Sequence, residues 1–199
     1  FLDDSACNLA SINLMKFRQA DGGFDSARFI AACRTVFIAQ EILVDRCSYP
    51  TKRIAANSHR FRPIGLGYSN LGSLIMAAGL PYDSDQARGL CGAITALLHG
   101  AANRTSAELA AVAGPFDGFA ENRDPMLHVM EMHWQKAEEL ECCPDELKSA
   151  ARKLWDEVLT SGRRHGFRNA QATVLAPTGT ISFMMDCDTT GIEPDIALV

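Results

Sequence analysis

One short run near the end of the chain combines the residue types that can hold an anion. Residues 176–182 read Ala-Pro-Thr-Gly-Thr-Ile-Ser, follow a strand-like segment over 171–175, and contain no charged side chain. Proline fixes the backbone direction, glycine lets the backbone approach a ligand, and the hydroxyls can donate hydrogen bonds. If a helix begins here, its free N–H groups point out of the same loop. The run therefore predicts a phosphate-binding loop without a lysine, and an ordinary turn is the alternative.

A second candidate is the thiol of Cys7, which lies near the opposite end of the chain. Residues 7–17 alternate without a strongly polar face, which is typical of a strand buried on both sides. Cysteines in such strands are usually inert small hydrophobes. The residue type and its surroundings alone therefore favour a structural role for Cys7.

The other cysteines and the histidines do not suggest a metal site. Cys142 and Cys143 are adjacent in sequence, but no second pair lies nearby to complete a zinc site. Cys187 stands between two aspartates, whose negative charges do not favour a reactive thiol. His128 and His133 are five residues apart, whereas the helical metalloprotease pattern needs four. We therefore expect structural roles for these cysteines and no bound metal.

Composition and charge restrict the class of protein. The 199 residues are 47% hydrophobic and 22% charged, with a net charge of -5, as in an ordinary globular protein. The negative charge argues against a nucleic-acid binder, and no apolar run is long enough to cross a membrane. The acidic start at residues 1–4 is unlike a secretory signal. Seven cysteines without a disulfide pattern indicate reduced thiols, so we expect a cytoplasmic protein.

Helical patterns fill the middle of the chain and would have to position both candidates. Three arginines before the loop, Arg163, Arg164 and Arg168, could add a positive field, although a solvated helix end is favoured for them.

We expect one α/β domain segment over residues 1–199, and the apolar ends indicate a piece of a larger fold. The expected helices span 25–48, 69–78, 83–113, 124–140 and 144–164, with a loop or short helix over 53–62, a loop over 117–123 and a strand over 167–176.

Taken together, the two ends of the chain resemble the large catalytic chain of ribonucleotide reductases. Residues 5–14 (Ser-Ala-Cys-Asn-Leu-Ala-Ser-Ile-Asn-Leu) are similar to the family's strand that carries one of two redox cysteines. Residues 168–182 and then 190–194 (Thr-Gly-Ile-Glu-Pro) are similar to its substrate-phosphate loop and the segment after it. The stretches 64–67 and 79–84 look like the family's mid-barrel helices. The resemblance covers essentially the whole chain.

Within that family, the stretches 184–190 and 1–4 look closest to the bacterial adenosylcobalamin-dependent class. The iron-dependent class is the alternative inside the family. A non-catalytic helical interaction domain is the alternative outside it, because the chain has long, well-capped helices and lacks a complete catalytic set.

The resemblance implies a ten-stranded α/β barrel, of which this chain is a helix-rich piece. It implies thiyl-radical reduction of ribonucleoside diphosphates for DNA synthesis, with adenosylcobalamin as cofactor and a thioredoxin-like reductant as partner. Cys7 matches one of the two reducing cysteines. The residues that match the phosphate loop are Pro177, Thr178, Gly179, Thr180 and Ile181, with Ser182 beside them.

Other parts of the family's machinery would lie outside this chain. These are the Asn-x-Cys-x-Glu loop of the radical cysteine, the redox partner of Cys7, and the region that binds nucleotide effectors. We therefore expect the chain alone to be inactive, and a homodimer is one option for the complete protein. In that protein, Cys7 and the loop at 176–182 are expected to converge on one nucleotide-sized cavity.

Overall fold

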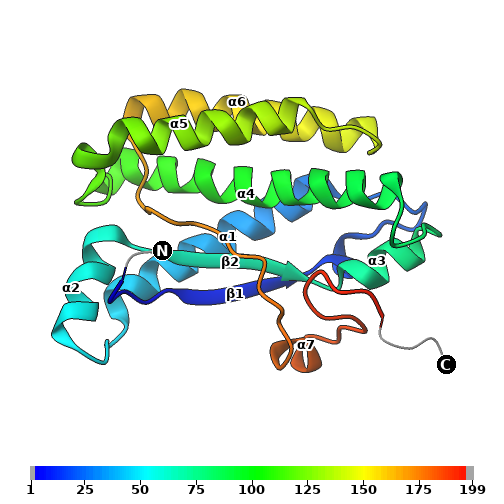
Figure 1. The fold of residues 1–199 in the computed structure, drawn as a ribbon, viewed down its shortest axis with the longest axis horizontal. Coiled ribbons are helices and arrows are strands. Elements are labelled where there is room, and N and C mark those ends of the chain that lie inside the picture. Colours follow the sequence, from blue (N-terminus) through cyan, green and yellow to red (C-terminus); the bar gives the residue numbers. More distant parts are fainter. Residues whose placement is uncertain (1–2, 196–199) are drawn as a thin grey trace.

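The structure, a computed structural model, describes residues 3–195. The apolar ends at residues 1–2 and 196–199 lie outside the described residues. Figure 1 shows a layered arrangement in which α4 runs between the pair α5 and α6 and the layer that holds α1 and the strands. In chain order the elements are β1 (Asn8–Asn13), the 3-10 turn η1 (Leu14–Phe17), α1 (Ser26–Arg46), α2 (Lys52–Phe61), β2 (Ile64–Ser69), α3 (Leu71–Ala77), α4 (Asp85–Ala113), α5 (Phe119–Glu138), α6 (Asp145–His165) and α7 (Ile181–Met184).

The sheet is built around β2. Strand β1 pairs with it in parallel, in a register that sets Asn8 opposite Ile64. On the other edge of β2, the segment 171–174 runs alongside, with the Ile64 N–H donating to the Gln171 carbonyl at 2.9 Å. The expected strand near 171–175 is therefore an extended segment beside β2, where Leu66 and Thr173 form one parallel bridge. This small, open sheet does not by itself show the ten-stranded barrel that the resemblance implies.

The prediction of a strand over 7–17, buried on both sides, is wrong in two respects. The strand ends at Asn13, because its Oδ1 accepts a hydrogen bond from the Met15 N–H at 3.0 Å and starts the turn η1. In addition, one face of β1 is open: Leu9 is 61% exposed, whereas Ile12 is buried. Other parts of the chain therefore cover the face of β1 that carries Ile12, whereas the face that carries Leu9 stays open.

The expected helix over 69–78 is wrong at its start, and the stretch 64–67 is not the helix that the resemblance implies. Residues 64–69 form the fully buried strand β2, and the helix begins only at Leu71. Glycines usually weaken strands, but here they permit close approach of the neighbours. A Cβ at Gly65 would overlap the Leu9 side chain, and one at Gly67 would overlap the Val174 carbonyl.

Most of the long helices lie where they were expected. Asp25 caps α1 through the Arg28 N–H at 3.0 Å, and residues 53–62 take the helical option as α2. Ser84 caps α4, so the helix expected over 83–113 is confirmed with a start two residues later, at Asp85. The loop expected over 117–123 is wrong, because α5 already begins at Phe119.

The early start of α5 has a packing cause. The ring of Phe119 lies 5.5 Å from that of Phe116 and 6.4 Å from that of Phe167, both in edge-on contacts. The expected start of this helix at residue 124 is therefore too late, and Pro125 lies inside the helix. Burial of these aromatic rings therefore accounts for the start of the helix at Phe119.

Two apolar clusters hold these layers together, one between the sheet and α4 and the other among α4, α5 and α6. Helix α4 takes part in both, and many of its buried residues are small. A Cβ at Gly100 would lie 2.9 Å from Leu154 Cδ2, so the glycine lets α6 pack closely. Within residues 3–195, the helices are too short or too polar to span a lipid bilayer.

Candidate functional site

The predicted phosphate loop lies beside the open face of β1. A hollow of about 250 Å³ separates the two. Its walls come from three consecutive strand residues and from the loop, namely Leu9, Ala10, Ser11, Ala176, Thr178, Gly179, Thr180 and Ile181. The open strand face and the loop, far apart in sequence, thus form one small site.

The loop hydroxyls fall into two groups. Thr178 is only 9% exposed, and its Oγ1 lies 2.8 Å from the Oγ of the buried Ser182. The Gly191 N–H also donates to Thr178 Oγ1 at 2.7 Å. Thr180 is instead exposed at the mouth of the loop. Thr178 and Ser182 therefore support the loop from inside, and Thr180 offers its hydroxyl outward.

The loop backbone supplies further donors. Thr178 has a φ of 55°, and the Ser182 N–H closes the turn on the Thr178 carbonyl at 2.9 Å. Among residues 3–195, the N–H groups of Gly179, Thr180 and Ile181 donate to no protein acceptor. Successive free N–H groups of this kind form a concave site for anions. The expected helix follows, but α7 has only four residues.

The segment after the loop clamps it in place. Gly191 has a φ of 43°, and a Cβ there would lie 2.9 Å from the Ala176 carbonyl oxygen, so this position requires glycine. Thr189 fixes the segment to the start of α3: its N–H donates to Asn70 Oδ1 and its Oγ1 accepts from the Ser73 N–H, both at 3.1 Å. The Thr-Gly-Ile-Glu-Pro motif therefore supports the loop.

Two buried asparagines tie the far end of the loop to the sheet. Asn13 Nδ2 donates to the carbonyls of Met185 at 2.9 Å and Asp186 at 3.2 Å. Asn70 Nδ2 donates to Asn13 Oδ1 at 3.1 Å, which joins the ends of β1 and β2. Neither residue was a sequence candidate, although a polar residue at the end of an apolar strand is a usable signal.

Cys7 lies one residue before β1, between two anchored neighbours. The Ala6 N–H donates to Ser58 Oγ at 3.0 Å, and Asn8 exchanges two 3.1 Å hydrogen bonds with Gln40. Partial burial raises the pKa of the Cys7 thiol, so it is protonated at neutral pH. All seven cysteines, Cys7 included, are free thiols.

The hollow begins two residues beyond Cys7. Its strand wall starts at Leu9, so Cys7 is not itself one of the lining residues. Residues two apart on an extended strand face the same side. Cys7 therefore directly precedes the strand that lines the hollow, but it is not one of the lining residues.

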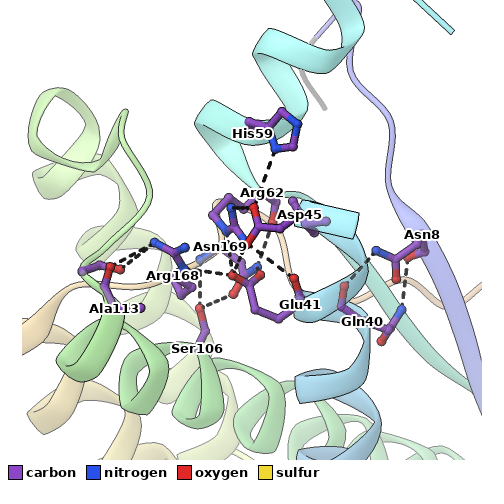
Figure 2. A network of polar contacts seen from close by, with 12 residues as sticks. Asn8, Gln40, Glu41, Asp45, His59, Arg62, Ser106, Ala113, Arg168 and Asn169 are labelled. Carbon is purple, nitrogen blue, oxygen red and sulfur yellow. Dashed lines mark hydrogen bonds and ion pairs between the residues drawn. The ribbon is translucent and has the colours of Figure 1, made fainter. Parts of the chain in front are cut away.

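A buried ionic network fixes the segment that leads to the loop (Figure 2). Glu41 of α1 accepts hydrogen bonds from Arg62 Nε at 2.6 Å and from Arg168 Nε at 2.9 Å. It also accepts one from Asn169 Nδ2 at 2.6 Å. The solvated helix end expected for Arg168 is therefore wrong, because its side chain is only 18% exposed and its guanidinium is paired with Glu41.

The same network holds a second carboxylate. The Arg62 guanidinium binds both oxygens of Asp45 at 2.8 Å, and this hydrogen bonding lowers the pKa of Asp45. Ser106 Oγ of α4 accepts from the Asn169 N–H at 3.0 Å. Side chains of α1 and α4 thus both form hydrogen bonds with residues 168–169, a few residues before the loop begins.

The chain matches known proteins over its whole length. Residues 2–199 match the family described as "Ribonucleotide reductase, barrel domain". A protein of Rhodopirellula baltica named "Vitamin B12-dependent ribonucleotide reductase" is 74% identical over 200 residues, which is 100% of this chain and 19% of that protein. One of the same name from Streptomyces coelicolor is 49% identical over 205 residues, covering 100% of this chain and 21% of the relative.

A more distant relative carries a more specific name. A "Vitamin B12-dependent ribonucleoside-diphosphate reductase" of Mycobacterium tuberculosis is 31% identical over 193 residues, or 97% of this chain and 22% of that protein. The chain therefore spans about a fifth of the length of these relatives. The family match over nearly all residues confirms the resemblance seen at the two ends: this chain belongs to the ribonucleotide reductase barrel-domain family.

Proposed function

We propose that this chain is part of the catalytic barrel of a vitamin B12-dependent ribonucleotide reductase, which reduces ribonucleoside diphosphates for DNA synthesis. The names of its relatives support this class over the iron-dependent one and over a helical interaction domain. The observation that carries the proposal is the hollow of about 250 Å³ between β1 and the loop, into which a phosphate-bearing ligand would fit.

The loop is proposed to bind the substrate phosphates through its backbone. The free N–H groups at residues 179–181 and the exposed Thr180 hydroxyl would donate to phosphate oxygens. The loop has no charged side chain. Its neutral N–H and hydroxyl donors, all directed at the phosphate, would therefore do what a lysine does in other phosphate sites. Thr178 and Ser182 would act by holding that orientation.

Cys7 is proposed to supply one of the two thiols that reduce the ribose. In the overall reaction two thiols become one disulfide, the 2′-hydroxyl leaves as water, and a hydrogen takes its place at carbon 2′. The two electrons come from the sulfurs, and the thiol protons balance the water and the new C–H bond. The second thiol would lie elsewhere in the complete protein, and a thioredoxin-like reductant would then reopen the disulfide.

The cofactor proposed for the complete protein is adenosylcobalamin, which supplies the initiating radical. The hollow beside β1 is too small for a corrin ring. Its lining residues would therefore contact the substrate and not the cofactor. We also propose that β1 and β2 belong to a ten-stranded barrel completed by the rest of the protein, whose dry interior would protect a radical. The free thiols fit a cytoplasmic setting.

The proposal is tested by binding measurements on the complete, cobalamin-free reductase that contains this chain. Thr180→Val removes the exposed hydroxyl, and Thr180→Pro also removes the N–H at a position whose φ of -81° suits proline. We expect ribonucleoside diphosphate affinity to fall about 10-fold in the first variant and further in the second. The affinity for the nucleoside without phosphates should not change.

Thr160→Val on the exposed side of α6 is the matched control for loss of a threonine hydroxyl. Equal diphosphate affinity in the wild type, Thr180→Val and Thr180→Pro would overturn the phosphate assignment. A parallel loss for the nucleoside would also overturn it, because the loop would then not act through the phosphates.

A further inference from the structure

Cys7 lies between two residues that are bound to two different helices. The residue before it, Ala6, donates its N–H to Ser58 Oγ of α2 at 3.0 Å. The residue after it, Asn8, is joined to Gln40 of α1 by two hydrogen bonds of 3.1 Å. The backbone on both sides of the thiol is therefore held by side chains that are distant in the chain.

The contact between Asn8 and Gln40 is reciprocal. Asn8 Nδ2 donates to the Gln40 carbonyl, and Gln40 Nε2 donates to the Asn8 carbonyl (Figure 2). Gln40 is only 3% exposed, so water competes little for these hydrogen bonds. Hydrogen bonds that are shielded from water are electrostatically stronger than exposed ones. The pair therefore holds the backbone of Asn8 against α1.

Helix α2 holds the segment on the other side of the thiol. Ser58 is fully buried, and its hydroxyl also lies 3.4 Å from the Ala6 carbonyl, to which it can donate. Its neighbour Asn57 donates from Nδ2 to the carbonyls of Asp3 and Asp4, both at 3.1 Å. Ser58 is thus the last of a series of contacts that fix residues 3–6 along α2.

The two supporting helices are joined to each other next to these contacts. Glu41, the neighbour of Gln40 on α1, accepts a hydrogen bond from Arg62 Nε at 2.6 Å. Arg62 ends α2, and its N–H donates to the Ser58 carbonyl at 2.8 Å. Glu41 and Arg62 are both buried. The supports on the two sides of Cys7 are therefore fixed relative to each other.

We propose that Gln40 and Ser58 are positioning residues for Cys7, which they hold where its sulfur forms a disulfide. This inference rests on the proposed function, in which Cys7 is one of two reducing thiols. A disulfide requires its two Cα atoms to lie about 4.4–6.8 Å apart, so the backbone at Cys7 has to stay within narrow limits. Holding one thiol in place raises its effective concentration at the other, which stabilises the disulfide.

The test measures the reduction potential of the disulfide that contains Cys7 in the complete, cobalamin-free reductase. The protein is equilibrated with mixtures of reduced and oxidised dithiothreitol, quenched with an alkylating reagent and analysed by mass spectrometry. In this exchange Cys7 and its partner thiol each lose one proton and one electron as the S–S bond forms. Oxidised dithiothreitol takes up both protons and both electrons and becomes the dithiol.

Two variants remove the two supports separately. Gln40→Met keeps the length of the side chain but removes its N–H donor, and Ser58→Ala removes the buried hydroxyl. We expect each change to lower the equilibrium constant for disulfide formation about 10-fold, which makes the potential about 30 mV less negative. Gln135→Met on α5 and Ser149→Ala on α6 alter exposed side chains of the same types, and these controls should keep the wild-type potential.

The thermal midpoint is measured alongside, because a residue that only stabilises the fold would lower the midpoint without moving the potential. Ser58→Ala removes a single atom and decides the test if Gln40→Met does not fold. Variant potentials equal to or more negative than that of the wild type would overturn the positioning role and leave the reducing role of Cys7 intact. If Cys7 of the wild type stays a thiol at every dithiothreitol ratio, its reducing role fails, and this inference fails with it.

Discussion

The amide nitrogen of Gly191 lies 2.7 Å from Oγ1 of Thr178, 13 residues earlier in the chain. This hydrogen bond joins the loop of the candidate site to the segment that follows it. Because Thr178 is nearly buried and holds a left-handed backbone conformation, the bond keeps the free N–H groups of residues 179–181 in a fixed arrangement.

Thr178→Val should loosen the loop without removing a ligand contact. The change keeps the volume but leaves the buried Gly191 N–H without an acceptor, which costs about 1–3 kcal/mol locally. We expect KM for the ribonucleoside diphosphate to rise several-fold, with little change in kcat. Steady-state kinetics of the complete reductase measure this, and Thr178→Ser should restore the wild-type KM. A wild-type KM in Thr178→Val would show that the hydroxyl does not position the loop.

Gly191→Ala should disturb the loop more than an equivalent change at another left-handed glycine. At Gly191 a Cβ meets the carbonyl oxygens of Ala176 at 2.9 Å and Pro177 at 3.0 Å. Gly79 has a φ of 68° but no atom within 4 Å, so Gly79→Ala adds only backbone strain of about 1 kcal/mol. Diphosphate affinity should fall in Gly191→Ala and stay normal in Gly79→Ala. Equal affinities would contradict the clamp.

The sequence predicts much of this structure where local pattern decides it. Helix α1, helix α4 and the loop at 176–182 follow from capping residues, apolar spacing and turn chemistry. Strand β2 was missed because Gly65 and Gly67 disfavour strands locally, and only the close approach of Leu9 and Val174 explains them. Such a requirement is set by neighbours distant in the chain, so no window of sequence contains it.

The same reason explains the parts of the site that were missed. From the sequence, Arg168 is predicted to lie at a solvated helix end. In the structure it is paired with Glu41, which is 127 residues away in the chain. Asn13 and Asn70 have ordinary residue types, and their role appears only when the ends of β1 and β2 are side by side. The residue types of the loop predict its hydrogen-bond donors. The residues that hold the loop in place make contacts that are distant in the chain, so the sequence does not predict them.

Glu41→Gln should destabilise the protein strongly. It leaves the buried Arg62 with only Asp45 as a charged partner and Arg168 with none, and breaking a buried ion pair costs about 3–5 kcal/mol. The thermal midpoint of the complete reductase should fall by several degrees. Glu108→Gln, which removes the charge from the more exposed pairs with Arg34 and Arg104, is the control and should change it little. Equal midpoints in the two variants would refute the importance of the network.

The Asp45 carboxylate should contribute stability with a defined pH dependence. Hydrogen bonding to Arg62 lowers its pKa in the folded state, so its contribution is complete above the unfolded pKa of about 3.9. It is lost as the pH falls through the lower folded pKa. The thermal midpoint of wild type minus that of Asp45→Asn should therefore be constant between pH 7 and 5. Loss of the difference in that range would contradict the lowered pKa of Asp45.

The redox role of Cys7 can be measured directly in the complete, cobalamin-loaded reductase. The enzyme is reduced, freed of external reductant, given ribonucleoside diphosphate, and quenched with an alkylating reagent before mass spectrometry. A disulfide that includes Cys7 should appear in proportion to the deoxyribonucleotide formed, while the buried Cys33 stays a free thiol. Accumulation of product with Cys7 still fully reduced would contradict its assignment as a reducing thiol.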